Sequence, residues 1–341
     1  MTRQIAIICT GGTIACTANH TGALVPTVSG RQLVDAARNS LADDLSFRIH
    51  DTLQLDSSSI GLPELDTLLT TIAKHAVDPE VDAVVVTHGT DSMEESAFAT
   101  ALLVHGAPVV FTGAQRAFDH PDTDGPGNLA GAISRAVELA ANTRGSVNAQ
   151  PAGMAASTVE VHFAARNLPA TAVHKQHTSE LAAFTAHGPA VSVDVLPADA
   201  VSVDASALPS PSSASPAIPV LSGYFVPVIA GYPGATAELL EHAVDAGADG
   251  LVIEALGSGN LSAKLGHAAQ RAVQQGIPVV VATRVPEGAV KLAYGGGGGG
   301  ATLAEYGAVS ARTVHPGQAR LALIIALATG INPEELFRCF D

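Results

Sequence analysis

Two turns of the chain carry residue types that suit nucleophilic catalysis. The first reads Thr10-Gly11-Gly12-Thr13-Ile14-Ala15, and the second reads Thr87-His88-Gly89-Thr90-Asp91. In each turn, glycine permits a close approach of the backbone and leaves a threonine hydroxyl exposed. A threonine beside glycine is by itself more often a turn or helix-cap residue, and an aspartate before a helix is most often an N-cap. Two such turns at the ends of strands in one sheet are rarer and favour a shared cleft.

The elements that must position these turns alternate between short β-branched runs and amphipathic segments. Strands are predicted at residues 4–9, 47–53, 82–87 and 109–112, and helices at 30–38, 62–75, 94–105 and 128–142. This alternation predicts an α/β fold with a larger N-terminal, mostly parallel sheet flanked by helices. Ligands of such sheets bind beyond the carboxyl ends of the strands, which is where both threonine-bearing turns lie.

A smaller C-terminal α/β domain is predicted to follow. Residues 145–184 are less regular and predict loops and short strands, while residues 196–219 are rich in Pro, Ser and Ala, as a connector or exposed insertion is. Strand and helix patterns then alternate again over 225–230, 238–246, 250–254, 264–275 and 278–282. We therefore predict an N-terminal catalytic domain at 1–195, a connector at 196–219 and a C-terminal domain at 220–341.

Composition narrows the classes of partner. The 341 residues are 47% hydrophobic and 14% charged, yet no apolar run reaches the roughly 18 residues that a membrane span needs, so a soluble protein is expected. The net charge is -15, from 32 acidic and 17 basic residues, and this charge would repel nucleic acid and anionic lipid. A small molecule is the expected ligand.

Metal, disulfide and dinucleotide chemistry lack their usual signals. The three cysteines, Cys9, Cys16 and Cys339, lack the spacing of a zinc site or a disulfide framework, which favours a reducing compartment. The 13 histidines form no His-Glu-x-x-His pattern, and no Gly-x-Gly-x-x-Gly follows a strand.

The N-terminus leads directly into a predicted strand, whose apolar run is too short for a signal peptide, so the cytoplasm is the expected location.

Together, the two turns resemble the paired signatures of the bacterial L-asparaginase family in spacing as well as in sequence. Four further segments resemble the family, so that the similarity covers nearly the whole chain: Asp56-Ser57-Ser58, Thr112-Gly113-Ala114-Gln115-Arg116, Asp124-Gly125-Pro126-Gly127-Asn128-Leu129 and Gly257-Ser258-Gly259-Asn260-Leu261. The resemblance implies an amidohydrolase that converts L-asparagine to L-aspartate and ammonia through a threonine acyl-enzyme, without metal or organic cofactor.

The resemblance also implies catalytic roles. Thr13 corresponds to the nucleophile, and Thr90, Asp91 and Lys175 correspond to a second catalytic group. Lys175 is matched by register, because Phe184 follows it by nine residues as in the family; a solvated surface charge is the alternative interpretation. An unassisted threonine hydroxyl is a poor nucleophile, so Lys175 and Asp91 would act through Thr90 as a proton relay, and backbone N–H groups in both turns would stabilise the oxyanion.

The substrate-binding residues follow from the same resemblance. Ser57 would hold the substrate α-carboxylate, and Asp91 would hold its α-ammonium group. Ser58 stands where the family often has glutamine, which bears on the choice between asparagine and glutamine. The other expected binding residues are Gly89, Ala114 and Asn260. The Asn260 loop would reach a neighbouring subunit's site in a dimer or tetramer, although an asparagine in such a turn is equally often a helix cap.

The chain departs from the family in the loop after the nucleophile. The family commonly places a tyrosine there, but residues 16–30 contain none, and Leu24 lies near the expected position. Tyr294 precedes six glycines, Gly295 to Gly300, whose composition predicts a flexible segment. We therefore hypothesise that Leu24 or Tyr294 belongs to a lid.

Glutamine hydrolysis and a binding protein that has lost catalysis remain alternatives, although binding alone would not require both Thr13 and Thr90.

Overall fold

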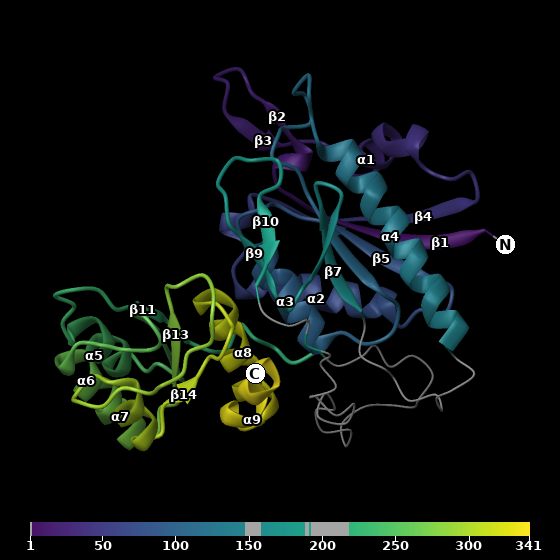
Figure 1. The fold of residues 1–341 in the computed structure, drawn as a ribbon. Helices are drawn as coiled ribbons and strands as arrows, with labels where there is room; N and C mark the ends of the chain where they lie inside the picture. Colours follow the sequence, from purple (N-terminus) through teal and green to yellow (C-terminus); the bar gives the residue numbers. More distant parts are fainter. Residues whose placement is uncertain (1, 147–157, 188–190, 192–217) are drawn as a thin grey trace. The chain divides into compact units, whose positions relative to one another are not determined.

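The computed structural model describes residues 2–146, 158–187, 191 and 218–341 (Figure 1). The chain divides into two compact units, Met1–Ala186 with Ser192–Ile218, and His187–Val191 with Pro219–Asp341. Nearly all of the connector predicted at residues 196–219 lies outside the described residues. Each unit has its own sheet.

The first unit is built on a six-stranded sheet. Its strand order is β4 (Leu45–Leu55), β1 (Arg3–Gly11), β5 (Ala83–Thr87), β6 (Val109–Thr112), β7 (Val159–Phe163) and β8 (Arg166–Pro169). Neighbouring strands are parallel from β4 to β7, and only the β7–β8 pair is antiparallel. The predicted α/β class with a mostly parallel N-terminal sheet is confirmed.

Helices cover both faces of this sheet (Figure 1). Helices α2 (Leu62–Ala76) and α3 (Met93–Leu103) pack in one core cluster, and α1 (Gly30–Ala37) and α4 (Gly125–Ser146) pack in the other. Alternate residues of β1 serve the two cores, Ala6 and Ile8 on one side and Ile5 and Ile7 on the other. Burial on both faces explains why the central strands read as continuous apolar runs.

The register of the sheet aligns the ends of its central strands. Cys9 of β1 is paired with Thr87 of β5, which is paired in turn with Thr112 of β6. Because all three strands run in the same direction, their following turns begin side by side at one edge of the sheet.

Two smaller pairs of strands lie outside the main sheet. The hairpin β2 (Cys16–Ala18) and β3 (Leu24–Pro26) follows the first turn. Strands β9 (Val173–Lys175) and β10 (Phe184–Ala186) form a separate antiparallel pair, which we call the β9–β10 arm. Val173 and Phe184 of this arm are buried in the core cluster that contains α3, so side-chain packing joins the arm to the helix.

The second unit is a smaller α/β fold. Its four parallel strands lie in the order β11 (Val228–Ala230), β12 (Leu251–Ala255), β13 (Val279–Thr283) and β14 (Val309–Ser310). Its helices are α5 (Glu238–Asp245), α6 (Ala263–Gln274), α7 (Gly300–Glu305), α8 (Pro316–Thr329) and α9 (Pro333–Phe337). The elements from α7 onward were not predicted. No helix among the described residues is long and apolar enough to span a membrane.

Candidate active site

The turn after β1 holds Thr13 in a constrained backbone. Gly11 and Gly12 have φ of 98° and 73°, in the left-handed region that favours glycine. The Gly12 N–H donates to the Leu55 carbonyl at 2.9 Å, and the Gly12 carbonyl accepts the Ala15 N–H at 2.9 Å. Half-buried Thr13 then begins a short 3-10 helix, Thr13–Ala15. The two glycines turn the chain sharply enough to leave the threonine at the edge of the sheet.

Three strand-end turns meet at this point. A Cβ placed on Gly12 would lie only 2.3 Å from the Cα of Gly89, and a Cβ placed on Gly89 would lie 2.5 Å from Ser57 Oγ. Any side chain at Gly12 would thus collide with backbone of the turn after β5. The close approach brings the predicted residues Thr13, Ser57 and Gly89 into one site.

Lys175 joins the second threonine to its aspartate. Its Nζ donates to Thr90 Oγ1 at 2.8 Å and to Asp91 Oδ1 at 2.8 Å. Thr90 is 5% exposed, the Lys175 side chain is 18% exposed and the Asp91 side chain is 64% exposed. The interpretation of Lys175 as a solvated surface charge is therefore wrong. A lysine in this position can give a proton to the hydroxyl as the ammonium group and take one from it as the neutral amine.

Ser57 connects the turn after β4 to the start of α3. It is buried at the start of a 3-10 helix, Ser57–Ser59. Its Oγ accepts the Asp91 N–H at 3.1 Å, and its carbonyl accepts the Ser92 hydroxyl at 2.7 Å. A serine hydroxyl that accepts this bond still has its own proton to donate, as binding of a carboxylate would require. Ser58 is exposed.

His88 fixes the orientation of the peptide between Gly89 and Thr90 in the second turn. It is fully buried, and its Nδ1 lies 2.8 Å from the Gly89 carbonyl oxygen. Burial lowers the pKa of His88 to about 4, so the ring is neutral at pH 7 and Nδ1–H donates to that carbonyl. In a trans peptide the next N–H points the opposite way. The Thr90 N–H is therefore directed away from His88, as an oxyanion donor in this turn requires.

The buried His88 predicts sensitivity to acid. Between pH 6.5 and about 4 the unfolded chain protonates this histidine and the folded chain does not, so the free energy of unfolding falls as the pH falls. The full loss is about 3 kcal/mol, since one pKa unit corresponds to about 1.4 kcal/mol. Urea denaturation of wild type and His88→Asn at pH 7 and pH 4 measures the effect. Equal losses of stability in both proteins would contradict it.

The loop after β6 is fixed by residues whose roles the sequence did not show. The Asp124 carboxylate accepts the Arg116 N–H at 2.9 Å, and the Asn128 side chain donates to the Gly113 carbonyl at 3.0 Å. These bonds hold the loop that contains Ala114, which is buried in the same core cluster as Ile14, next to Thr13. The segment from Asp124 to Leu129 resembles the family in sequence, but its scaffold function depends on contacts across the fold.

Asn260 and Tyr294 belong to the second unit. The Asn260 Oδ1 accepts the Gly300 N–H at 3.4 Å, and the Tyr294 side chain is largely exposed. Leu24 of the first unit lies exposed in β3. Their roles as subunit-bridging or lid residues stay predictions.

The prediction of a flexible glycine run is wrong for residues 298–300. These glycines are buried, and a Cβ on Gly298 would lie 2.3 Å from the Leu261 carbonyl oxygen, while one on Gly300 would lie 2.5 Å from the Leu292 Cα. Close backbone packing, which only glycine permits, explains half of the run.

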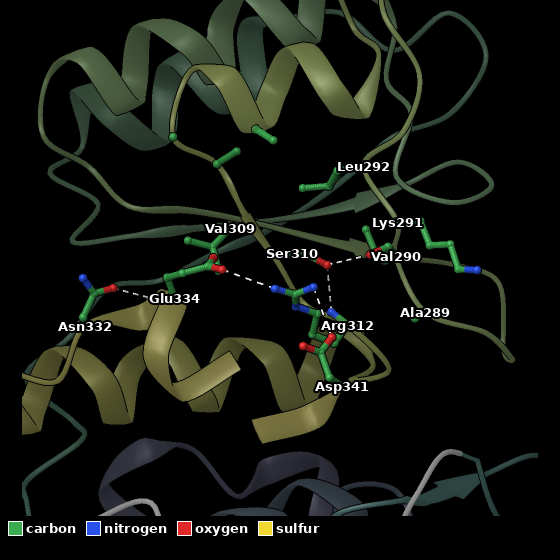
Figure 2. A pocket seen from close by; sticks show the side chains of 13 residues that line it. Ala289, Val290, Lys291, Leu292, Val309, Ser310, Arg312, Asn332, Glu334 and Asp341 are labelled. Atoms are coloured by element: carbon green, nitrogen blue, oxygen red, sulfur yellow. Dashed lines mark hydrogen bonds and ion pairs between the residues drawn. The ribbon is translucent and has the colours of Figure 1, made fainter. Parts of the chain in front are cut away.

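A cavity of about 870 Å³ in the second unit contains none of the predicted site residues (Figure 2). Arg312 lies in it with a left-handed φ of 59° and makes ion pairs with Glu334 Oε1 at 3.2 Å and Asp341 Oδ1 at 3.1 Å. These pairs tie α9 and residue 341 to the turn after β14.

Among the residues that the structure describes, no three His, Cys, Asp or Glu side chains are grouped to hold a metal ion.

Comparisons with known proteins identify the family of this chain. The family profile described as asparaginase, N-terminal matches residues 4–206, and the one described as glutaminase/asparaginase C-terminal domain matches residues 225–340. The chain is 35% identical to a probable L-asparaginase of Deinococcus radiodurans, over 99% of this chain and 97% of the relative. It is 30% identical to an L-asparaginase of Bacillus licheniformis, over 96% and 97%.

Solved structures give the same result for the fold. The thermostable L-asparaginase from Thermococcus kodakarensis matches with a TM-score of 0.76 at 23% identity, covering 99% of this chain and 96% of that chain. A probable cytoplasmic L-asparaginase from Campylobacter jejuni matches with a TM-score of 0.73 at 25% identity, covering 99% of both. The family profiles and the relatives define an amidohydrolase enzyme. The chain belongs to the bacterial L-asparaginase family.

Proposed function

We propose that this protein is an L-asparaginase that converts L-asparagine and water to L-aspartate and ammonia through an acyl-enzyme on Thr13. The observation that supports it most is the Lys175 ammonium group, which lies 2.8 Å from both Thr90 Oγ1 and Asp91 Oδ1 beside the Thr13 turn. A binding protein would need neither this arrangement nor a second hydroxyl. Fold and relatives agree with the proposal.

The proposed chemistry has two steps. In the first, Thr13 Oγ attacks the side-chain amide carbon of asparagine, and its proton passes through Thr90 and Lys175 to the departing nitrogen, which leaves as ammonia. In the second, water attacks the resulting ester, the C–O bond to Thr13 breaks, and L-aspartate leaves as Thr13 regains its proton. Both steps form an oxyanion. Backbone N–H groups in the two turns would stabilise it, each worth about 3 to 4 kcal/mol.

The proposed substrate contacts select a free amino acid. The Ser57 hydroxyl would bind the α-carboxylate, and the exposed Asp91 carboxylate would bind the α-ammonium group. A peptide lacks both of these charges at an internal asparagine, so neither contact could form. Gly89 and Ala114 would line the site through their backbones, and Ser58 would border it from the turn after β4.

Glutamine hydrolysis is the second candidate. One relative of 31% identity, from Methanopyrus kandleri, is a component of a glutamyl-tRNA(Gln) amidotransferase; the match covers 85% of this chain and 63% of that longer protein. Ser58 stands where the family often has glutamine, and its shorter side chain would offer different polar contacts to the side-chain amide of L-glutamine.

The assembly and location of the protein also stay proposals. We propose a homo-oligomer, a dimer or tetramer, in which the Asn260 loop of one copy reaches the site of another. We propose the cytoplasm as its location, in agreement with the neighbour described as a probable cytoplasmic L-asparaginase. Neither a nucleic acid nor a membrane is proposed as a partner.

The test is ammonia release by the wild-type protein from L-asparagine, L-glutamine and a dipeptide amide. We expect release from asparagine, less from glutamine and none from the dipeptide amide. Faster release from glutamine would favour the second candidate. Release from none of the three above the buffer rate would exclude an amidohydrolase with these substrates.

A further inference from the structure

Glu94 holds the strand that carries Lys175. It lies in the first turn of α3, three residues after Asp91, and its side chain is only 12% exposed. Its Oε2 accepts the backbone N–H of Lys175, and its Oε1 lies 3.3 Å from His174 Nδ1. One carboxylate therefore contacts two consecutive residues of β9.

The β9–β10 arm needs such a contact. Strand β9 has only three residues and pairs with β10 in a sheet separate from the main one. Packing of Val173 against the α3 core fixes the depth of the strand, but apolar packing is not directional. The hydrogen bond from the Lys175 N–H to Glu94 is directional. It fixes the position of the Lys175 backbone, from which the side chain extends.

The carboxylate of Glu94 favours a proton on its histidine partner. Its hydrogen bond raises the pKa of His174, and the negative charges of Glu94 and Glu95 act in the same direction, against the effect of burial. When His174 carries this proton, the pair of Glu94 and His174 is neutral overall. Thr90, Asp91 and Glu94 all lie at the N-terminal end of α3, so this one helix end positions both ends of Lys175.

We propose that Glu94 is the positioning residue for Lys175: its carboxylate, held by His174, fixes the backbone of β9 so that the lysine reaches Thr90 and Asp91 together. The inference rests on the proposed function, since the lysine needs positioning only if it transfers protons. Glu94 contacts the backbone of Lys175 and not the reacting groups, so it acts through the lysine.

The test compares Glu94→Gln with Glu238→Gln, which removes the same charge from the exposed first turn of α5 in the second unit. Glutamine carries no charge, so Glu94→Gln replaces the charged acceptor of the Lys175 N–H with a neutral one and removes the ion pair with His174. We expect kcat to fall by about tenfold or more, because small misplacements of catalytic groups are costly, with KM changed by less than about threefold. Glu238→Gln should change kcat by less than about twofold.

A double variant separates positioning from general stability. If Glu94 acts through Lys175, adding Glu94→Gln to Lys175→Met should cause no further loss of the residual kcat, because effects of groups that act as a unit do not multiply. A multiplicative loss in the double variant would overturn the proposal, as would a Glu238→Gln loss equal to that of Glu94→Gln.

Two further controls keep the result interpretable. Should Glu94→Gln fail to fold by circular dichroism, Glu94→Asp keeps the charge but withdraws it by one methylene, and a kcat equal to wild type would overturn the proposal. The wild type is measured first: inactive wild type contradicts the proposed function, whereas active wild type with fully active Glu94→Gln contradicts only this inference.

Discussion

Thr13→Ala is expected to lower kcat for asparagine hydrolysis by at least about 10⁴-fold, because loss of a covalent nucleophile removes the whole acyl-enzyme route. The turn should persist, since its geometry comes from Gly11, Gly12 and the hydrogen bond from Gly12 to Leu55. Ammonia release under saturating asparagine measures the loss. Thr67→Ala, which removes an exposed threonine hydroxyl from α2, is the matched control and should leave kcat unchanged.

Two further measurements on Thr13 make the result specific. Thr13→Ser keeps the hydroxyl and should retain part of the turnover, and rapid quenching of wild type with substrate should give a covalent adduct that Thr13→Ala lacks. If Thr13→Ala kept more than about a hundredth of wild-type kcat, the reaction would not pass through this hydroxyl.

Lys175→Met is expected to lower kcat by about 10² to 10⁴-fold, the range for loss of a positioned proton-transfer group. Methionine matches much of the lysine stem but makes no hydrogen bond to Thr90 Oγ1 or Asp91 Oδ1, which the ammonium group joins at 2.8 Å. KM should rise by a smaller factor, because Asp91 remains present to bind the substrate. Full progress curves at several pH values would give both constants.

Lys74→Met is the control for this prediction. Lys74 lies exposed near the end of α2 and carries the same charge. If Lys175→Met and Lys74→Met gave the same kcat, the proton relay through Thr90 would be contradicted, while the nucleophilic role of Thr13 would still stand.

The parallel sheet and the position of its site could be predicted from local sequence. Strand ends at Thr87 and Thr112 follow from β-branched runs that stop one or two residues before a glycine, and the parallel topology places such ends at one edge. Helix α3 is buried almost all round, yet the Asp-Ser signal before it identified its start. Helix α8, which has no exposed residue, was not predicted, because apolar residues on every side leave no periodic pattern.

The supporting residues could not be predicted because their contacts span long stretches of chain. Glu94 contacts a residue 81 positions away, and Lys175 contacts Thr90 across 85 positions. Lys175 was found only through its match to a known family, and no local pattern marks Glu94 as a partner of the arm. The glycine content of Gly298 to Gly300 predicted flexibility wrongly, since glycine is also used where two backbone segments pack closely.

The β9–β10 arm implies that activity and global folding have different stabilities. The arm is not a strand of the main sheet, and it is joined to the rest of the unit by the buried side chains of Val173 and Phe184 and by side-chain hydrogen bonds, those of Glu94 and Lys175 among them. Supersecondary units of this kind can open locally at a lower free energy than the whole domain. Mild denaturant should therefore detach Lys175 and stop turnover while the central strands still protect their amides from hydrogen exchange, so inactivation would report the opening of the arm and not the melting of the protein.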